Sequence, residues 1–197
     1  SAQSLHRKPT CDPKLAKDAA YISKADLSSE MVYEFPELQG IMGTYYAKKA
    51  GYVASIADTC KDHYAPLGPS DEVPGSPIST VVALADKIDT LTNFWAIEEK
   101  PTGSKDPFAL RRSALGMIRI IIENDIRISL SEILAMGNQN ANIEDLKEFI
   151  YQRMKVFLRE KELRHDIIDA CLSIDKEDDL ALSVKKSFGL IEFIKTS

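Results

Sequence analysis

A group of basic residues in the middle of the chain has the composition and spacing to bind phosphate. Arg112 and Arg119 lie seven residues apart, with Gly116 between them, so all three share one face of a helix. Lys100 and Lys105 come just before this helix, near the free N–H groups of its first turn, which attract anions. Guanidinium groups contact phosphate oxygens in pairs. The pattern therefore predicts a phosphate-binding surface.

Arg111, next to Arg112, completes the set that we predict to contact nucleic-acid phosphates, namely Lys100, Lys105, Arg111, Arg112 and Arg119. The apolar side of the same helix carries Phe108, Leu115, Ile118 and Ile122. The pattern fits equally well a solvated helix face whose arginines pair with Glu123 and other acids. The loop before the helix lacks the glycine spacing of a nucleotide-binding P-loop.

A pair of carboxylates, Glu34 and Glu37, is spaced as an acid and a base on one helix face would be. No nucleophile and no metal-binding motif accompanies them in the sequence. Gly40 and Gly43 follow closely and indicate close packing between helices. We therefore assign this segment a structural role.

Three further strings resemble the metal-binding helices of the HD hydrolase superfamily. They are residues 19–27 (AAYISKADL), 62–66 (DHYAP) and 84–89 (LADKID). Ala25 stands where that superfamily has its histidine, and Asp26 keeps the aspartate. His63 and Asp86 stand at the later positions. The resemblance implies a helical HD-like domain in which Ala25, Asp26, His63 and Asp86 mark a degenerate centre.

The chemistry of an HD hydrolase requires several His and Asp ligands that converge on one or two cations. Alanine cannot bind a metal, so we expect no functioning metal centre. Asp26 and Asp86 are expected to hydrogen-bond backbone amides or lysines within the helical packing. His63 is expected to be partly exposed beside a loop. A metal-dependent phosphohydrolase that uses Asp26, His63 and Asp86 remains the alternative function.

Helical periodicity dominates the chain and predicts an all-α fold. Asp106 and Pro107 are predicted to be the N-cap and first residue of the basic helix. Asn142 is predicted to cap a helix of about 18 residues. The proline-rich segment 65–77 must be a loop. The expected helices cover residues 14–28, 33–50, 52–64, 80–97, 107–124, 129–136, 143–160, 166–172 and 180–194.

Composition sets the remaining limits. Hydrophobic residues make up 44% and charged residues 28% of the 197 residues, as in ordinary globular proteins. The net charge of -5 excludes a uniformly basic surface, so any nucleic-acid contact must be local. The three cysteines, Cys11, Cys60 and Cys171, lack metal-binding spacing and fit a reducing compartment. No apolar run is long enough for a transmembrane helix.

Three strings together resemble the β subunit of bacterial glycyl-tRNA synthetase. They are residues 31–43 (MVYEFPELQGIMG), 85–91 (ADKIDTL) and 103–112 (GSKDPFALRR). The match covers about residues 12–123, and the region from Asn142 resembles the start of that subunit's helical anticodon-binding domain. The resemblance thus implies a tail at 1–11, an HD-like domain at 12–137 and a partial anticodon-binding-type domain at 142–197. The missing initiator Met suggests an internal segment.

The resemblance also implies a function. The family supports aminoacylation of tRNA(Gly) as glycine–tRNA ligase, a cytoplasmic heterotetramer of two α and two β subunits. ATP and Mg²⁺ would be used by the catalytic α subunit, so no catalytic residue and no cofactor is expected in this segment. tRNA and the α subunit are the implied partners, with neither DNA nor membrane. A scaffold that docks the α subunit through an apolar face is a third hypothesis.

Overall fold

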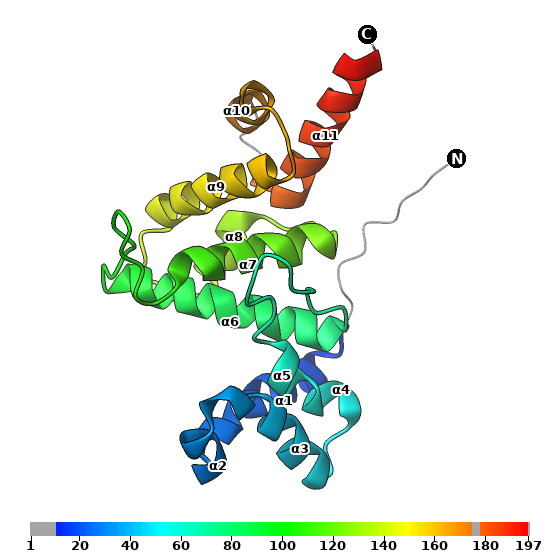
Figure 1. Ribbon diagram of the computed structural model, residues 1–197, viewed down its shortest axis with the longest axis vertical. Helices are drawn as coiled ribbons and strands as arrows, with labels where there is room; N and C mark the ends of the chain where they lie inside the picture. Colours follow the sequence, from blue (N-terminus) through cyan, green and yellow to red (C-terminus); the bar gives the residue numbers. More distant parts are fainter. Residues whose placement is uncertain (1–10, 175–177, 197) are drawn as a thin grey trace. The chain divides into compact units, whose positions relative to one another are not determined.

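The computed structural model describes residues 11–174 and 178–196, and within these ranges the fold is all-α, which confirms the predicted class. The β structure in these ranges is a single isolated bridge between Thr102 and Lys105. None of the described helices is both long enough and apolar enough to cross a membrane. The elements along the chain (Figure 1) are α1 Pro13–Ile22, η1 Ala25–Ser28, α2 Glu30–Glu34, η2 Pro36–Leu38, α3 Ile41–Lys49, α4 Ala54–Ala57, α5 Thr59–Asp62, α6 Pro77–Ala96, α7 Leu110–Glu123, α8 Leu130–Ala135, α9 Ile143–Glu160, α10 His165–Ile174 and α11 Leu180–Thr196.

The chain divides into two compact units, and the division falls inside α6. One unit is Pro9–Asp86, here called the N-terminal unit. The other contains the residues from Lys87 onward and is here called the C-terminal unit. The predicted boundary near residues 137–141 lies within the C-terminal unit, because α9 packs on both α7 and α8. The assignment of residues 12–137 and 142–197 to two family domains stays a prediction.

The N-terminal unit is built from short helices around a small core. α1 begins as its sequence requires: Asp12 is the N-cap and accepts a hydrogen bond from the Lys14 amide at 2.8 Å. It ends at Ile22, before the predicted end, where the Ser23 hydroxyl donates to the Ala20 carbonyl and competes with the helical bonds. The buried apolar residues of this core are Ala19, Ile22, Ala47, Ile56, Ala57, Cys60, Ile78 and Val82.

The helix predicted within residues 33–50 is present as α3, but it begins at Ile41 and not near Pro36. The residues before it belong to α2 and η2. Pro36 lacks an N–H donor and forces Phe35 out of the helical region, to φ -129° and ψ 77°. Gly40 then adopts φ 78°, in the left-handed region, and α3 begins after it. The predicted helix over 52–64 is likewise replaced by the shorter α4 and α5.

The C-terminal unit packs its helices around α7 and α9. α7 contacts α9 and α11, and α10 contacts α9 and α11 (Figure 1). Residues 116–121 of α7 are all buried. α9 confirms the prediction for its segment, since Asn142 caps an 18-residue helix and accepts from the Asp145 amide at 3.2 Å.

The predicted start of the basic helix is wrong by three residues. α7 begins at Leu110, and its N-cap is Ala109 rather than Asp106. The Asp106 carboxylate still caps this helix, because it accepts from the amides of Leu110 at 2.8 Å and Arg111 at 3.0 Å. Its bonds reach further along the chain than those of an ordinary N-cap, so the three residues after it form a turn instead of helix.

Asp178 links α8, α9 and the start of α11. Its carboxylate accepts from the Ser129 hydroxyl at 2.6 Å and the Ser131 amide at 2.7 Å, and the Lys147 ammonium lies 2.9 Å away. Burial by itself would raise the pKa of this carboxyl, but the bonds from Ser129, Ser131 and Lys147 outweigh it and hold the pKa at about 2.

This lowered pKa predicts a stability change in acid. A carboxyl whose pKa falls on folding stabilises the fold above its ordinary pKa of 3.8 and loses that contribution as the pH falls towards 2. We expect Asp178→Asn to cost about 1–2 kcal/mol at neutral pH and progressively less below pH 4. Urea unfolding followed by Trp95 fluorescence at pH 7, 4, 3 and 2 measures the difference. A difference that does not change with pH would contradict the assignment.

Candidate nucleic-acid interface

Of the basic residues singled out in the sequence, Lys100 and Lys105 lie in the loop between α6 and α7, and the three arginines lie in α7. Several contacts fix this loop. Thr102 and Lys105 exchange two backbone hydrogen bonds, at 3.1 and 2.8 Å. The Arg111 guanidinium donates from Nη2 to the Gly103 carbonyl at 2.7 Å. Together with the Asp106 cap, these bonds tie the loop to the first turn of α7. The loop therefore presents its side chains in a defined arrangement.

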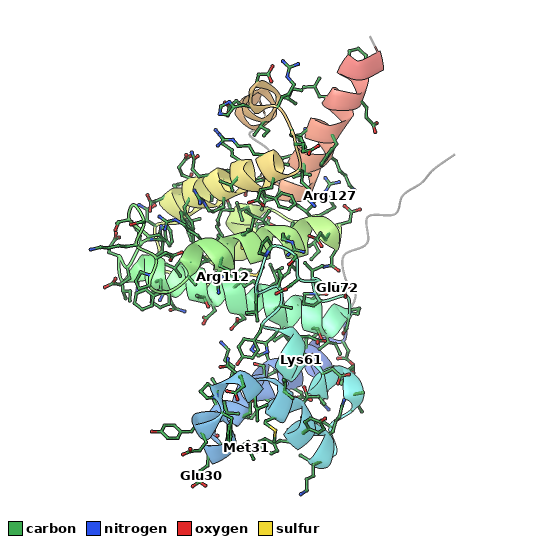
Figure 2. The ribbon with its side chains drawn as sticks, in the orientation of Figure 1. Glu30, Met31, Lys61, Glu72, Arg112 and Arg127 are labelled. Atoms are coloured by element: carbon green, nitrogen blue, oxygen red, sulfur yellow. The ribbon has the colours of Figure 1, made fainter. Side chains whose placement is uncertain are left out.

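Two of the five predicted phosphate-binding residues are exposed, one in the loop and one in the first turn of α7. This pair, Lys105 and Arg112, is here called the basic edge. Lys105 and Arg112 are both solvent-exposed, and no salt bridge involves either of them within the described ranges. Figure 2 shows the Arg112 side chain at the N-terminal part of α7. Arg111 is half-buried and holds Gly103. The structure thus leaves Lys105 and Arg112 best placed for an anion.

Lys100 is engaged with two acids. Its ammonium lies 2.7 Å from Glu98 and 3.0 Å from Asp145. These two hydrogen bonds, that of Glu98 first, raise the pKa of Lys100. The Trp95 indole donates to the same Asp145 carboxylate at 2.6 Å, and the Lys100 ammonium lies 5.9 Å from the indole ring. Lys100 therefore anchors the start of the loop to α9.

Arg119 is buried, with only 8% of its surface exposed. Its Nε donates to Glu123 at 2.8 Å, one helical turn along α7. The pairing of an arginine with Glu123 is the alternative that the sequence left open. A tRNA contact by Arg119 stays a prediction, as do the contacts of the other four residues.

The charges are divided unevenly along the chain. Residues 9–86, which form the N-terminal unit, contain six lysines, no arginine and eleven Asp or Glu residues. The whole excess of negative charge in the chain is therefore carried by this unit. A polyanion is repelled by such a unit, which places the electrostatically favourable contacts on the C-terminal unit.

Asp26, one of the degenerate HD positions, is a buried anchor for α3. It is 1% exposed, and its Oδ2 accepts from the amides of Gly40 at 2.7 Å and Gly43 at 2.9 Å. These are the N-cap and third residues of α3, whose N–H groups have no partner within the helix. The negative charge also faces the positive end of the helix dipole. The prediction that Asp26 binds backbone amides is confirmed.

Of the other HD positions, Asp86 and His63 also make structural contacts. Asp86 forms a salt bridge with Lys24, as predicted for a nearby lysine. Ala25 is exposed on η1. The expectation for His63 is wrong: the residue is fully buried, its Nδ1–H donates to the Thr59 carbonyl at 2.9 Å, and its ring lies 3.9 Å from that of Tyr64.

Burial is the main cause of the raised pKa values of Cys60 and Tyr64. It raises the pKa of the Cys60 thiol to about 11, and the negative charge of Asp26 adds to the effect. Burial also raises the pKa of Tyr64, with smaller increases from the charges of Asp26 and Asp86. Both groups therefore stay protonated at neutral pH, so neither supplies a nucleophile or a base there.

A pocket of about 540 Å³ opens beside Tyr64 in the N-terminal unit. Its wall is mainly apolar, with Lys61 (labelled in Figure 2) among its charged residues. Glu37 lines this pocket, whereas Glu34 ends α2, so the helix break separates the paired carboxylates. The lining residues are Pro36, Glu37, Gln39, Ile41, Lys61, Tyr64, Ala65, Leu67 and Asp71.

Within residues 11–174 and 178–196, no group of three or more His, Cys, Asp or Glu side chains is arranged to hold a metal ion. Asp26 faces the amides of α3, Asp86 faces Lys24, and His63 faces Thr59. Each of the three residues of the hydrolase alternative thus has a structural partner.

Comparison with known proteins relates this geometry to a family. The family model described as glycyl-tRNA synthetase beta subunit matches residues 2–173. The chain belongs to the glycyl-tRNA synthetase β-subunit family. It is 58% identical over 185 residues to the glycine–tRNA ligase beta subunit of Ruegeria sp. (strain TM1040), and 56% identical over 185 residues to that of Paracoccus denitrificans (strain Pd 1222). It is also 50% identical over 230 aligned residues to that of Dinoroseobacter shibae (strain DSM 16493 / NCIMB 14021 / DFL 12).

These alignments cover nearly all of this β-subunit chain but a smaller part of its relatives. They include 94%, 94% and 99% of this chain, and 27%, 27% and 32% of the respective relatives. The chain thus spans about a third or less of the length of the β subunits that it matches.

One exposed residue of this β-subunit chain, Phe108, departs from its predicted place on the apolar side of a helix. It stands between Lys105 and Arg112 in the chain. It precedes α7 and is 45% exposed. The available signal was its place in the GSKDPFALRR string, where a large apolar residue is surrounded by polar and basic ones.

Proposed function

We propose that this chain is a tRNA-contacting part of the β subunit of glycine–tRNA ligase. In this role, Lys105 and Arg112 neutralise tRNA phosphates and position the RNA without reading its bases. The observation that carries the proposal is that, in a member of the β-subunit family, these two cations are exposed on a loop and a helix turn that hydrogen bonds tie together.

The contacts of the neighbouring basic residues support different roles for the buried and the exposed cations. Arg111 holds the loop through Gly103, and Lys100 anchors its start through Glu98 and Asp145. Arg119 lies beneath the surface against Glu123. In this arrangement they fix the loop, and the exposed residues contact the RNA.

The family names of the relatives support the partners in this proposal. The chain acts with an α subunit that activates glycine with ATP and Mg²⁺, in a cytoplasmic assembly of two α and two β subunits. tRNA(Gly) is the RNA substrate, and this segment supplies no catalytic residue. The contacts of Asp26, His63 and Asp86 lend no support to the phosphohydrolase alternative.

The test is tRNA(Gly) binding by the assembled α and β subunits carrying Lys105→Ala or Arg112→Ala. Each change is expected to weaken binding about 3- to 10-fold and to reduce the slope of log affinity against log salt by about 1, because one phosphate contact is lost. Filter binding at several salt concentrations measures both quantities.

Lys49→Ala is the matched control for these variants. Lys49 is exposed in the acidic N-terminal unit, so its loss should leave both affinity and salt slope unchanged. Arg112→Lys keeps the charge and should keep most of the binding. If Lys105→Ala and Arg112→Ala behave like the control, the basic edge does not contact tRNA.

A further inference from the structure

Phe108 is a large, exposed apolar side chain that stands between Lys105 and Arg112 in the chain. Its ring stacks on Phe94 of α6, with the ring centroids 4.2 Å apart and the planes inclined by 27°. Phe94 is half-buried, whereas Phe108 is 45% exposed. Because Phe94 covers one face of the Phe108 ring, the exposed surface lies on the side turned away from Phe94.

The backbone around Phe108 is fixed on both sides. The two hydrogen bonds between Thr102 and Lys105 close the loop before it, and Asp106 caps the amides of Leu110 and Arg111 after it. Ala109 next to it has φ 54°, a left-handed conformation that is costly for a residue with a Cβ. The ring is thus ordered before any ligand arrives, so binding to it loses little conformational entropy.

The nearest exposed residues to Phe108 in the chain are mostly polar or basic. Lys105 precedes it by three residues and Arg112 follows it by four, and both are exposed. The loop residues Thr102, Gly103 and Ser104 are exposed as well. A protein partner would favour a broader apolar patch. An exposed aromatic ring with an exposed cation on either side of it in the chain instead matches a nucleotide, which has a flat base and a charged phosphate.

We propose that the exposed face of Phe108 stacks on an unpaired nucleobase of the tRNA, while Lys105 and Arg112 neutralise the adjoining phosphates. This inference rests on the proposed function and adds a base-stacking subsite to it. A base within a duplex is already stacked on its neighbours, so the ligand is a single-stranded nucleotide, as at a loop or a 3′ end. Stacking of this kind tolerates any base, so it contributes affinity without sequence preference.

The test compares Phe108→Leu with Phe108→Trp in the assembled α and β subunits. Leucine keeps an apolar side chain over Phe94 but has no π face, so tRNA affinity is expected to fall about 5- to 100-fold. Tryptophan offers a larger π face and should retain wild-type affinity or exceed it. Phe188→Leu, at a ring that is 42% exposed on α11, is the matched control and should leave affinity unchanged.

A spectroscopic probe reports the stacking directly. In tRNA carrying 2-aminopurine at an unpaired 3′-end position or loop position, fluorescence at one of these positions should be quenched by the wild-type ligase and by Phe108→Trp. The quenching should disappear with Phe108→Leu, and a short single-stranded RNA should compete for the site better than a duplex. Thermal unfolding of each variant verifies that its fold is intact.

The outcomes separate this inference from the proposed function. If the Lys105 and Arg112 variants weaken tRNA binding but Phe108→Leu does not, the phosphate contacts stand and the stacking subsite is refuted. If none of the three changes has an effect, both ideas fail. If Phe108→Leu instead reduces recovery of the α subunit and leaves tRNA affinity unchanged, the ring is a protein contact and the stacking subsite is again refuted.

Discussion

Replacing Asp26 with alanine is expected to lower the free energy of unfolding of the N-terminal unit by about 3–5 kcal/mol. The change leaves the buried amides of Gly40 and Gly43 without acceptors, and each unsatisfied buried donor costs about 1–3 kcal/mol. It also removes a negative charge from the N-terminus of α3. Hydrogen exchange measured by mass spectrometry tests this, because the amides of Gly40 and Gly43 should lose their protection.

Two further variants identify the cause of that effect. Asp58→Ala removes a carboxylate that is 48% exposed and paired with Lys48, so it should cost less than about 1 kcal/mol. Asp26→Asn keeps one oxygen acceptor for the two amides and should cost less than Asp26→Ala. Equal effects of Asp26→Ala and Asp58→Ala would refute the role of Asp26 as the anchor of α3.

Gly137→Ala is expected to destabilise the C-terminal unit by about 2–4 kcal/mol, because overpacking costs about 1–3 kcal/mol and a buried hydrogen bond is strained as well. An added Cβ would overlap Oγ1 of Thr92 and lie 2.8 Å from its Cγ2. Thr92 is fully buried and cannot move freely: its hydroxyl donates to the Ile88 carbonyl at 2.8 Å and accepts from the Asn138 amide at 3.1 Å.

The measurement uses the single tryptophan of the chain, Trp95, which lies in the same unit. Its fluorescence in urea should show a lower midpoint for Gly137→Ala. Gly189→Ala is the control, since nothing lies within 4 Å of that site on α11 and alanine should stabilise the helix by about 0.5–1 kcal/mol. Adding Thr92→Ala should relieve the clash. If the two single changes prove additive instead, the predicted contact is wrong.

The sequence predicted α9 well because all its signals are local. An Asn cap and a regular apolar stripe both act within one or two turns. The segment from 29 to 50 was predicted poorly because its structure depends on a distant residue. Pro36 could be read as a helix start, but the break at Gly40 is fixed by Asp26, which lies 14 residues away in the chain.

The same limit applies to the candidate site. The sequence identified Lys105 and Arg112 by type and spacing, and it allowed for the pairing of Arg119 with Glu123. It could not show which of the five basic residues are exposed, because their exposure depends on tertiary packing, such as that of α7 against α9 and α11. The burial of His63 and the stack of Phe108 on Phe94 also arise from tertiary contacts that no local pattern encodes.

Under the proposed function, the arginine-free, acid-rich composition of residues 9–86 would restrict how a bound RNA moves on this protein. A uniformly cationic surface would let a polyanion slide between many equivalent positions, with its charge satisfied in each. Here a strand that drifted onto the acidic unit would lose attraction and meet repulsion. Movement of the RNA along the surface would thereby be disfavoured, and the RNA would stay longest at exposed cations of the C-terminal unit such as Lys105 and Arg112.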